Sequence, residues 1–216
     1  MNKEIILTKD GSHSLFVPDL NENYHSVHGS IEEALHVFIK NGIHSYPKKN
    51  INILEVGFGT GLNALLTLEN RKQATVNYTA LEPYPVSNDI YTKLNFFERI
   101  NSEGDTFLKL HNSDWEQEIE INEKFIFYKS QKKLQNFTTD KKFDIIYFDA
   151  FSPETQPEMW TEQSLKKCYE LLNKEGFLVT YCAKGVVKRT LKSIGFEVIA
   201  LDGPPRKRQM TRANKL

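Results

Sequence analysis

From residue 51 onward, short apolar runs alternate with amphipathic stretches along the chain. The apolar runs are rich in β-branched and aromatic residues, which is typical of strands, whereas the stretches between them follow the helical period. Strands that alternate with helices indicate an α/β fold, in which a mostly parallel sheet carries helices on both faces. Strands are predicted over residues 51–56, 75–82, 123–130, 143–148, 177–183 and 196–203, and helices over residues 62–71, 87–97, 106–110, 162–172 and 186–194.

The first 50 residues follow a different pattern. Two-residue alternation near the start predicts a short hairpin that turns at Asp10–Gly11. Ser30 and Glu33 have the spacing of a capping box, which predicts a helix over residues 30–40. We therefore expect an N-terminal extension over residues 1–50, packed on a main domain over residues 51–216.

Composition and processing signals favour an ordinary cytoplasmic protein. Hydrophobic residues make up 39% of the chain and charged residues 26%, which is usual for a globular protein. The sequence has no apolar run of membrane-spanning length and no signal peptide. Cys168 and Cys182 are expected to be reduced thiols. His25, His28 and His36 lack a cysteine or carboxylate that would complete a ligand set, so no metal is expected.

The charge is neutral in total but uneven along the chain. Residues 184–216 hold nine Lys/Arg and two Asp/Glu, whereas residues 98–123 hold eight acids and two bases. A basic C-terminal face can meet a polyanion. On charge alone, a solvated surface is the simpler interpretation.

A glycine-rich segment between the first predicted strand of the main domain and the helix after it is the strongest local motif. It reads E-V-G-F-G-T-G-L-N from Glu55 to Asn63. Glycines allow a sharp turn and close approach of a ligand, and the helix that follows offers free N–H groups. A dinucleotide fingerprint would need a glycine where Leu62 stands, and no Lys-Ser/Thr pair follows for a P-loop. The pattern E-x-G-x-G-x-G resembles the first motif of class I methyltransferases.

Two acidic residues follow other predicted strands. Glu82 ends the second strand of the main domain, where a carboxylate can accept hydrogen bonds from ribose hydroxyls. Asp149 follows residues 143–148 and begins Asp-Ala-Phe-Ser-Pro, which resembles the fourth motif of amine methyltransferases. A carboxylate there can orient an amine and take its proton, and Phe151 can pack on the substrate or exclude water.

Further segments narrow the resemblance to one family. Residues 149–165 read DAFSPETQPEMWTEQSL, residues 176–198 read GFLVTYCAKGVVKRTLKSIGFEV, and residues 203–210 read GPPRKRQM. Together with LEVGFGTGLNALLTL at residues 54–68, they resemble the methyltransferase domain of the MnmC family. His25 and the Pro204–Pro205 insertion depart from that family's pattern.

The resemblance implies a class I, Rossmann-like methyltransferase fold with a seven-stranded sheet and S-adenosylmethionine as methyl donor. The implied substrate is the 5-aminomethyl group of the wobble uridine, often 2-thiolated, in the anticodon stem-loop of tRNA, and the product is 5-methylaminomethyluridine. In many bacteria this domain is fused to a flavin-dependent oxidase. This sequence has no second dinucleotide motif, so the stand-alone form is expected.

Site residues follow from the matching motifs. Asp149 and Phe151 are expected to face the amine, and Tyr24 and Ser26 to help close the pocket. The residues expected to hold the donor are Glu55, Gly57, Phe58, Gly59, Thr60, Gly61, Asn63, Glu82 and Asp149. The basic residues expected to contact tRNA are Lys188, Arg189, Arg206, Lys207 and Arg208.

Two alternatives to the tRNA enzyme stay open. One is a class I methyltransferase that acts on a small-molecule or protein amine, with an incidental basic C-terminal end. The other is a non-catalytic tRNA- or nucleotide-binding protein, against which Asp149 and the intact glycine segment argue.

Overall fold

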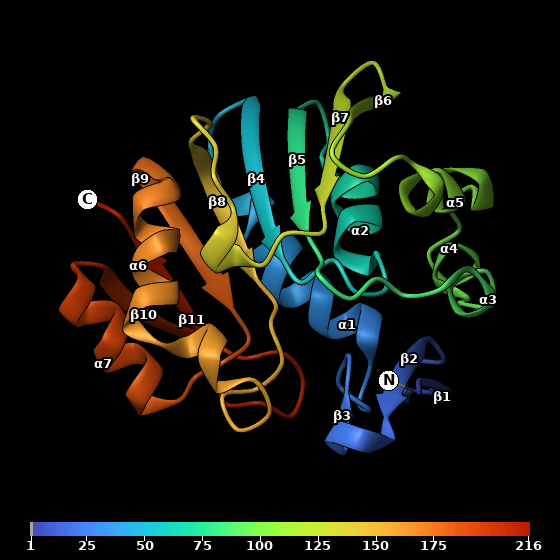
Figure 1. Ribbon diagram of the computed structural model, residues 1–216, viewed down its shortest axis with the longest axis horizontal. Coiled ribbons are helices and arrows are strands. Elements are labelled where there is room, and N and C mark those ends of the chain that lie inside the picture. Colours follow the sequence, from blue (N-terminus) through green and yellow to red (C-terminus); the bar gives the residue numbers. More distant parts are fainter. Residues whose placement is uncertain (1) are drawn as a thin grey trace.

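A single large sheet runs through the middle of the protein, whose computed structural model describes residues 2–216 (Figure 1). Its eight strands follow the order β10-β11-β9-β8-β4-β5-β7-β6. The five central strands, from β9 to β7, are parallel, and antiparallel strands flank them on both sides. The strands are β4 (Asn50–Val56), β5 (Thr75–Leu81), β6 (Glu118–Asn122), β7 (Phe125–Ser130), β8 (Phe143–Phe148), β9 (Leu172–Thr180), β10 (Glu197–Asp202) and β11 (Gln209–Asn214).

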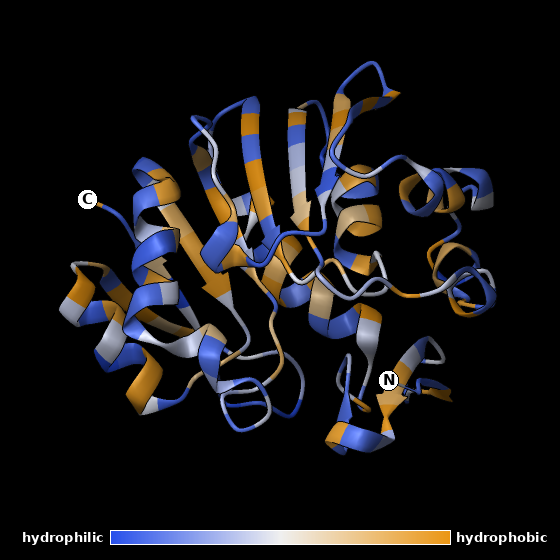
Figure 2. Ribbon diagram, viewed as in Figure 1, coloured by the Kyte–Doolittle hydropathy of each residue, from blue (hydrophilic) through white to orange (hydrophobic). Residues whose placement is uncertain are grey.

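Successive side chains of the central strands enter two separate cores. In β8, where every residue is buried, Ile145 and Tyr147 join one core while Ile146 and Phe148 join the other. Figure 2 shows hydrophobic residues gathered along these strands. A strand buried on both faces reads as a continuous apolar run, which is why the sequence reveals β8.

Helices cover both faces of the sheet. One core includes residues of α2, α5 and the N-terminal helices, and the other includes residues of α6 and α7. None of the helices in residues 2–216 is long and apolar enough to cross a bilayer. The helices are α1 (Ser30–Ala34), which continues as the π-helix η2 (Leu35–Lys40), α2 (Leu62–Asn70), α3 (Asn88–Tyr91), α4 (Phe96–Arg99), α5 (Gly104–Asn112), α6 (Glu162–Leu171) and α7 (Gly185–Ile194), with 3-10 turns η1 (Pro18–Leu20), η3 (Ile43–Ser45), η4 (Leu134–Asn136) and η5 (Pro157–Trp160).

The N-terminal residues form a second, three-stranded antiparallel sheet of β1 (Glu4–Leu7), β2 (His13–Val17) and β3 (Glu22–Asn23). The predicted hairpin is confirmed, and its turn contains Gly11 at φ +79°. This sheet lies below the carboxyl ends of the central strands in Figure 1. It therefore stands next to the edge where α/β sheets bind ligands.

The predicted capping box is wrong, although the helix after it exists. Ser30 Oγ donates to the carbonyl of His13 at 2.9 Å, and Glu33 Oε2 accepts from the backbone N–H of Ser26 at 3.2 Å. Asp10 Oδ2 instead accepts from the first backbone N–H groups of α1, those of Ile31 at 3.0 Å and Glu32 at 3.1 Å. A cap from a distant hairpin leaves no local signal in the sequence.

The predicted α/β fold with a mostly parallel sheet is confirmed, with one strand more than the seven expected. Two strands of the sheet were not predicted: β6, which occupies an acidic stretch, and β11, which lies between β9 and β10. The single helix predicted over residues 87–97 is divided into α3 and α4.

Candidate active site

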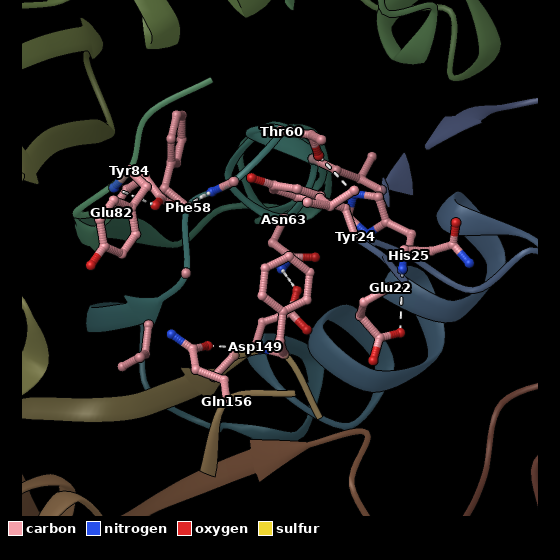
Figure 3. Close-up of a pocket in the computed structure, with 18 of the residues that line it drawn as sticks. Glu22, Tyr24, His25, Phe58, Thr60, Asn63, Glu82, Tyr84, Asp149 and Gln156 are labelled. Carbon is pink, nitrogen blue, oxygen red and sulfur yellow. Dashed lines mark hydrogen bonds between the residues drawn. The ribbon is translucent and has the colours of Figure 1, made fainter. Parts of the chain in front are cut away.

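A cavity of about 720 Å³ opens at the carboxyl ends of β4, β5 and β8 (Figure 3). Its volume suits a cofactor together with part of a substrate. The strand register explains which residues meet there. Val56 pairs with both Leu81 and Phe148, so the next residues, Gly57, Glu82 and Asp149, reach the same edge.

Gly57 turns the chain sharply out of β4. It has φ +95°, and a Cβ atom there would lie 2.7 Å from the backbone oxygen of Asp149. The backbone N–H groups of Gly57 and Phe58 donate to the carbonyl of Leu81 at 3.0 and 3.1 Å. The loop is therefore fastened to β5 while it touches the end of β8.

Glu82 anchors the same loop from β5. Its Oε2 accepts from the backbone N–H of Gly59 at 2.8 Å, and its Oε1 accepts from that of Tyr84 at 2.9 Å. The side chain lines the cavity with 7% of its surface exposed, and burial raises its pKa. Each carboxylate oxygen has a second lone pair, so Glu82 can also accept hydrogen bonds from the hydroxyls of a ligand.

Asp149 lies on the opposite wall, at the end of β8. Its Oδ2 accepts from Asn63 Nδ2 at 2.8 Å, as drawn in Figure 3. The pKa of this carboxyl is raised to about 7, mainly by burial; the charge of Glu33 adds to the rise, while the Asn63 hydrogen bond and Lys207 oppose it. Near neutral pH the group can both accept and release a proton.

An aromatic pair stands beside Asp149. The rings of Tyr24 and Phe151 meet edge to face, with centroids 5.1 Å apart. The backbone of Phe151 is fixed on both sides, because its N–H donates to Gln156 Oε1 at 3.2 Å and its carbonyl accepts from Trp160 Nε1 at 2.8 Å. Both rings line the cavity.

The segment around His25 closes the cavity over the glycine loop. Ser26 lines the cavity, and His25 Nε2 lies 2.7 Å from Thr60 Oγ1. Burial lowers the pKa of His25 to about 4, so the ring is neutral at physiological pH. The departure from the family pattern at this position thus supplies a polar contact between the N-terminal sheet and the loop.

The three basic residues 206–208 do not lie in the same environment. Arg206 has φ +71°, and Lys207 lines the cavity, where it forms an ion pair with Glu33 and stands 4.9 Å from the ring centroid of Tyr181. The neighbouring arginines are exposed, and Arg206 Nη1 lies 3.0 Å from His28 Nδ1. In α7, Arg189 is exposed and Lys188 donates to Gln209 Oε1 at 3.0 Å.

Two of the residues predicted to bind the methyl donor do not line the cavity. Glu55 is fully buried beneath the loop, and Gly61 lies behind it, against His111. The other predicted donor residues, Gly57, Phe58, Gly59, Thr60, Asn63, Glu82 and Asp149, all line the cavity.

Sequence reasoning missed several wall residues. Glu33 was assigned to a cap, although it lines the cavity beside Lys207. Tyr84, Lys133 and Gln135 line another part of the wall, and the Lys133 ammonium lies 5.8 Å from the ring centroid of Tyr84. The position of Tyr84 just after Glu82 was the one available signal. Within residues 2–216, no group of three or more His, Cys, Asp or Glu side chains is arranged to hold a metal ion.

The chain is similar to several known proteins. A family described as S-adenosyl-L-methionine-dependent methyltransferase matches residues 84–216. The chain is 30% identical over 207 residues to the tRNA 5-methylaminomethyl-2-thiouridine biosynthesis bifunctional protein MnmC of Leptospira interrogans, covering 87% of this chain and 31% of that protein. The protein of the same name from Marinomonas is 29% identical over 209 residues, covering 87% of this chain and 30% of that one.

A solved structure is similar over nearly the whole chain. The crystal structure of MNMC2 from Aquifex aeolicus matches with a TM-score of 0.76 and 27% identity, covering 98% of this chain and 70% of that one. The chain thus spans about a third of the length of the two bifunctional relatives and most of the solved one.

Proposed function

This chain belongs to the family of S-adenosyl-L-methionine-dependent methyltransferases, and on that premise we propose that it methylates the 5-aminomethyl group of the wobble uridine in tRNA. The product would be 5-methylaminomethyluridine, often 2-thiolated. The observation that carries the proposal is Asp149, which lies beside an aromatic pair in the cavity of an MnmC-like methyltransferase domain. A tRNA substrate also implies a cytoplasmic enzyme.

The residues of the cavity fit the donor. The backbone of residues 57–60 approaches the cavity without side-chain obstruction at its glycines, and Glu82 keeps acceptor capacity for ribose hydroxyls. When bound, S-adenosylmethionine supplies an electrophilic methyl group. We assign Gly57, Gly59, Thr60 and Glu82 to holding it.

Asp149 would prepare the amine. An alkylamine is protonated near neutral pH and needs a free lone pair to attack the methyl carbon. Asp149 would accept an N–H hydrogen bond from the amine and take the proton that it must lose. Tyr24 and Phe151 would hold the uracil ring and keep water from the reacting nitrogen.

The proposal predicts an acid limb near pH 7. Below this pH the Asp149 carboxyl is protonated and cannot take the proton that the amine must lose, so kcat/KM should fall about tenfold per pH unit. Glu33→Gln removes a negative charge that raises the Asp149 pKa and should move the limb to lower pH, whereas Lys207→Met should move it to higher pH.

Deprotonation of either the Asp149 carboxyl or the substrate amine would raise the rate as pH increases. The opposite shifts in the two variants show whether the carboxyl is the group that titrates. Initial rates measured against pH for the wild type and both variants would test them. A limb that stays in place in both variants would assign the titration to the amine alone.

We further propose that the exposed basic residues of the C-terminal part contact tRNA phosphates. Replacing Arg206 and Arg208 by alanine should weaken tRNA binding and reduce the slope of log K against log salt by up to about 2. Lys48→Ala with Lys49→Ala is the matched control, because these exposed lysines precede β4 at the opposite edge of the sheet. If the two double variants have equal slopes of log K against log salt, Arg206 and Arg208 do not contact tRNA.

The decisive test of substrate is direct. The enzyme is incubated with labelled S-adenosylmethionine and tRNA from cells that lack this protein, and the tRNA is digested to nucleosides. Label in 5-methylaminomethyluridine or its 2-thio form is expected. Label that enters only protein or small amines would favour the other methyltransferase hypothesis.

A further inference from the structure

Behind Asp149 lies a group of buried polar atoms that lack hydrogen-bond partners. They include both carboxyl oxygens of Glu55, Oδ1 of Asn63 and the hydroxyl of Tyr78. Glu55 and Tyr78 are almost completely buried, at 0% and 1% exposure. Buried polar groups are rarely left unpaired, so we expect these side chains to form a hydrogen-bond network with one another.

The orientation of Asn63 defines what is missing. Its Nδ2 donates to Asp149 Oδ2 at 2.8 Å, which turns Oδ1 away from the cavity and into the protein. That oxygen is an acceptor and needs a donor. Asn63 and Tyr78 are polar side chains that neighbour the Glu55 carboxyl, so the missing donor must be the carboxyl of Glu55 or the hydroxyl of Tyr78.

A neutral Glu55 completes the network with one proton. Its O–H would donate to Asn63 Oδ1, and its carbonyl oxygen would accept from the Tyr78 hydroxyl, which pairs one oxygen on each residue. Burial raises the pKa of Glu55 well above its ordinary value, and the neighbouring carboxylates of Asp149 and Glu82 raise it further. Ionisation would leave two acceptors, Glu55 and Asn63 Oδ1, facing each other.

We propose that Glu55 is a positioning residue that stays protonated and donates to Asn63, so that Asn63 presents its amide N–H to Asp149. Glu55 then acts through Asn63 and does not touch the donor. A flipped Asn63 would turn its oxygen toward the carboxylate of Asp149, which repels it. The inference rests on the proposed role of Asp149 and extends it inward to Glu55.

The first experiment uses the ligand-free protein. In a carbon NMR titration of carboxyl-labelled enzyme, the Glu55 signal, assigned by its loss in Glu55→Gln, should keep the shift of a protonated acid from about pH 5 to about pH 8. An ionisation within that range would overturn the proposal. This readout needs neither donor nor tRNA, so it holds even if the wild-type enzyme fails to methylate tRNA.

The second experiment compares two replacements of Glu55. Glu55→Gln keeps an N–H group that can donate to Asn63 and an oxygen that can accept from Tyr78. Its kcat should therefore stay within about threefold of the wild-type value, and its affinity for S-adenosylmethionine should not change. Leucine has a volume similar to that of glutamate but no group that can donate a hydrogen bond to Asn63. In Glu55→Leu, kcat should therefore fall about 10–100-fold, while the affinity for S-adenosylmethionine stays unchanged. The Asp149 acid limb should also move to higher pH, because the Asn63 hydrogen bond that lowers its pKa is lost.

Donor affinity gives the opposing outcome. If Glu55 were ionised and bound S-adenosylmethionine directly, Glu55→Gln would weaken the binding of S-adenosylhomocysteine at least tenfold, as measured by calorimetry. That loss would overturn the proposal. Should Glu55→Leu fail to fold, the titration and the Glu55→Gln variant still decide it.

Discussion

Replacing Asp149 with asparagine is expected to slow methyl transfer by about 10²–10⁴-fold while the enzyme still binds its donor. Asparagine has nearly the same shape, but it carries no charge and cannot take a proton from an amine. Because the proposed partner of Asp149 is the amine, the dissociation constant of S-adenosylhomocysteine should change little. Single-turnover rates with tRNA, together with calorimetry, measure both quantities.

The control for Asp149 lies on the loop that follows it. Glu154→Gln makes the same change of charge, but Glu154 is exposed, pairs with Lys184 and does not line the cavity. Its turnover should match that of the wild type. An Asp149→Asn variant that turned over normally at saturating donor, with weakened donor binding, would reassign this residue to the cofactor.

Replacing Gly57 with alanine is expected to abolish measurable donor binding. A non-glycine residue at φ +95° costs roughly 1–3 kcal/mol, and the new Cβ would stand 2.7 Å from the backbone oxygen of Asp149, which cannot rotate away. The loop would have to leave its hydrogen bonds to Leu81. Calorimetry with S-adenosylhomocysteine measures the loss of donor binding, and a thermal melt measures the loss of stability caused by the strained loop.

Gly195 offers a matched control for the backbone strain. It has φ +112° at the end of α7, and a Cβ atom there would meet no atom closer than 3.6 Å. Gly195→Ala should lower Tm while donor affinity is kept. If Gly57→Ala binds the donor as tightly as this control, the close approach of the loop to β8 does not matter for binding.

The parts that the sequence predicted are those with local signals. The apolar run of β8 and the glycines after β4 each report on their own surroundings, and the order of strands then brings Asp149 beside Gly57. Strand β11 was not predicted because a strand paired on both sides can still contain many polar residues: Thr211 is fully buried between β9 and β10 in a segment rich in polar residues.

Roles that depend on distant partners could not be read in advance. Glu33 has the spacing of a capping residue, yet Asp10 caps the helix and leaves Glu33 free to face Lys207. Lys207 looks like its arginine neighbours in the sequence, and only the turn at Arg206 directs it inward. Glu55 matches a cofactor motif, but burial changes what its carboxyl can do.

The ion pair between Glu33 and Lys207 joins two residues of the cavity wall that are 174 positions apart in the sequence. Contacts of such large separation form late when a chain folds, because the intervening segment must first be ordered. The loop of residues 57–63 needs only β4, β5 and β8 around it. We therefore expect the glycine loop to form before the contact between Glu33 and Lys207 when the chain folds.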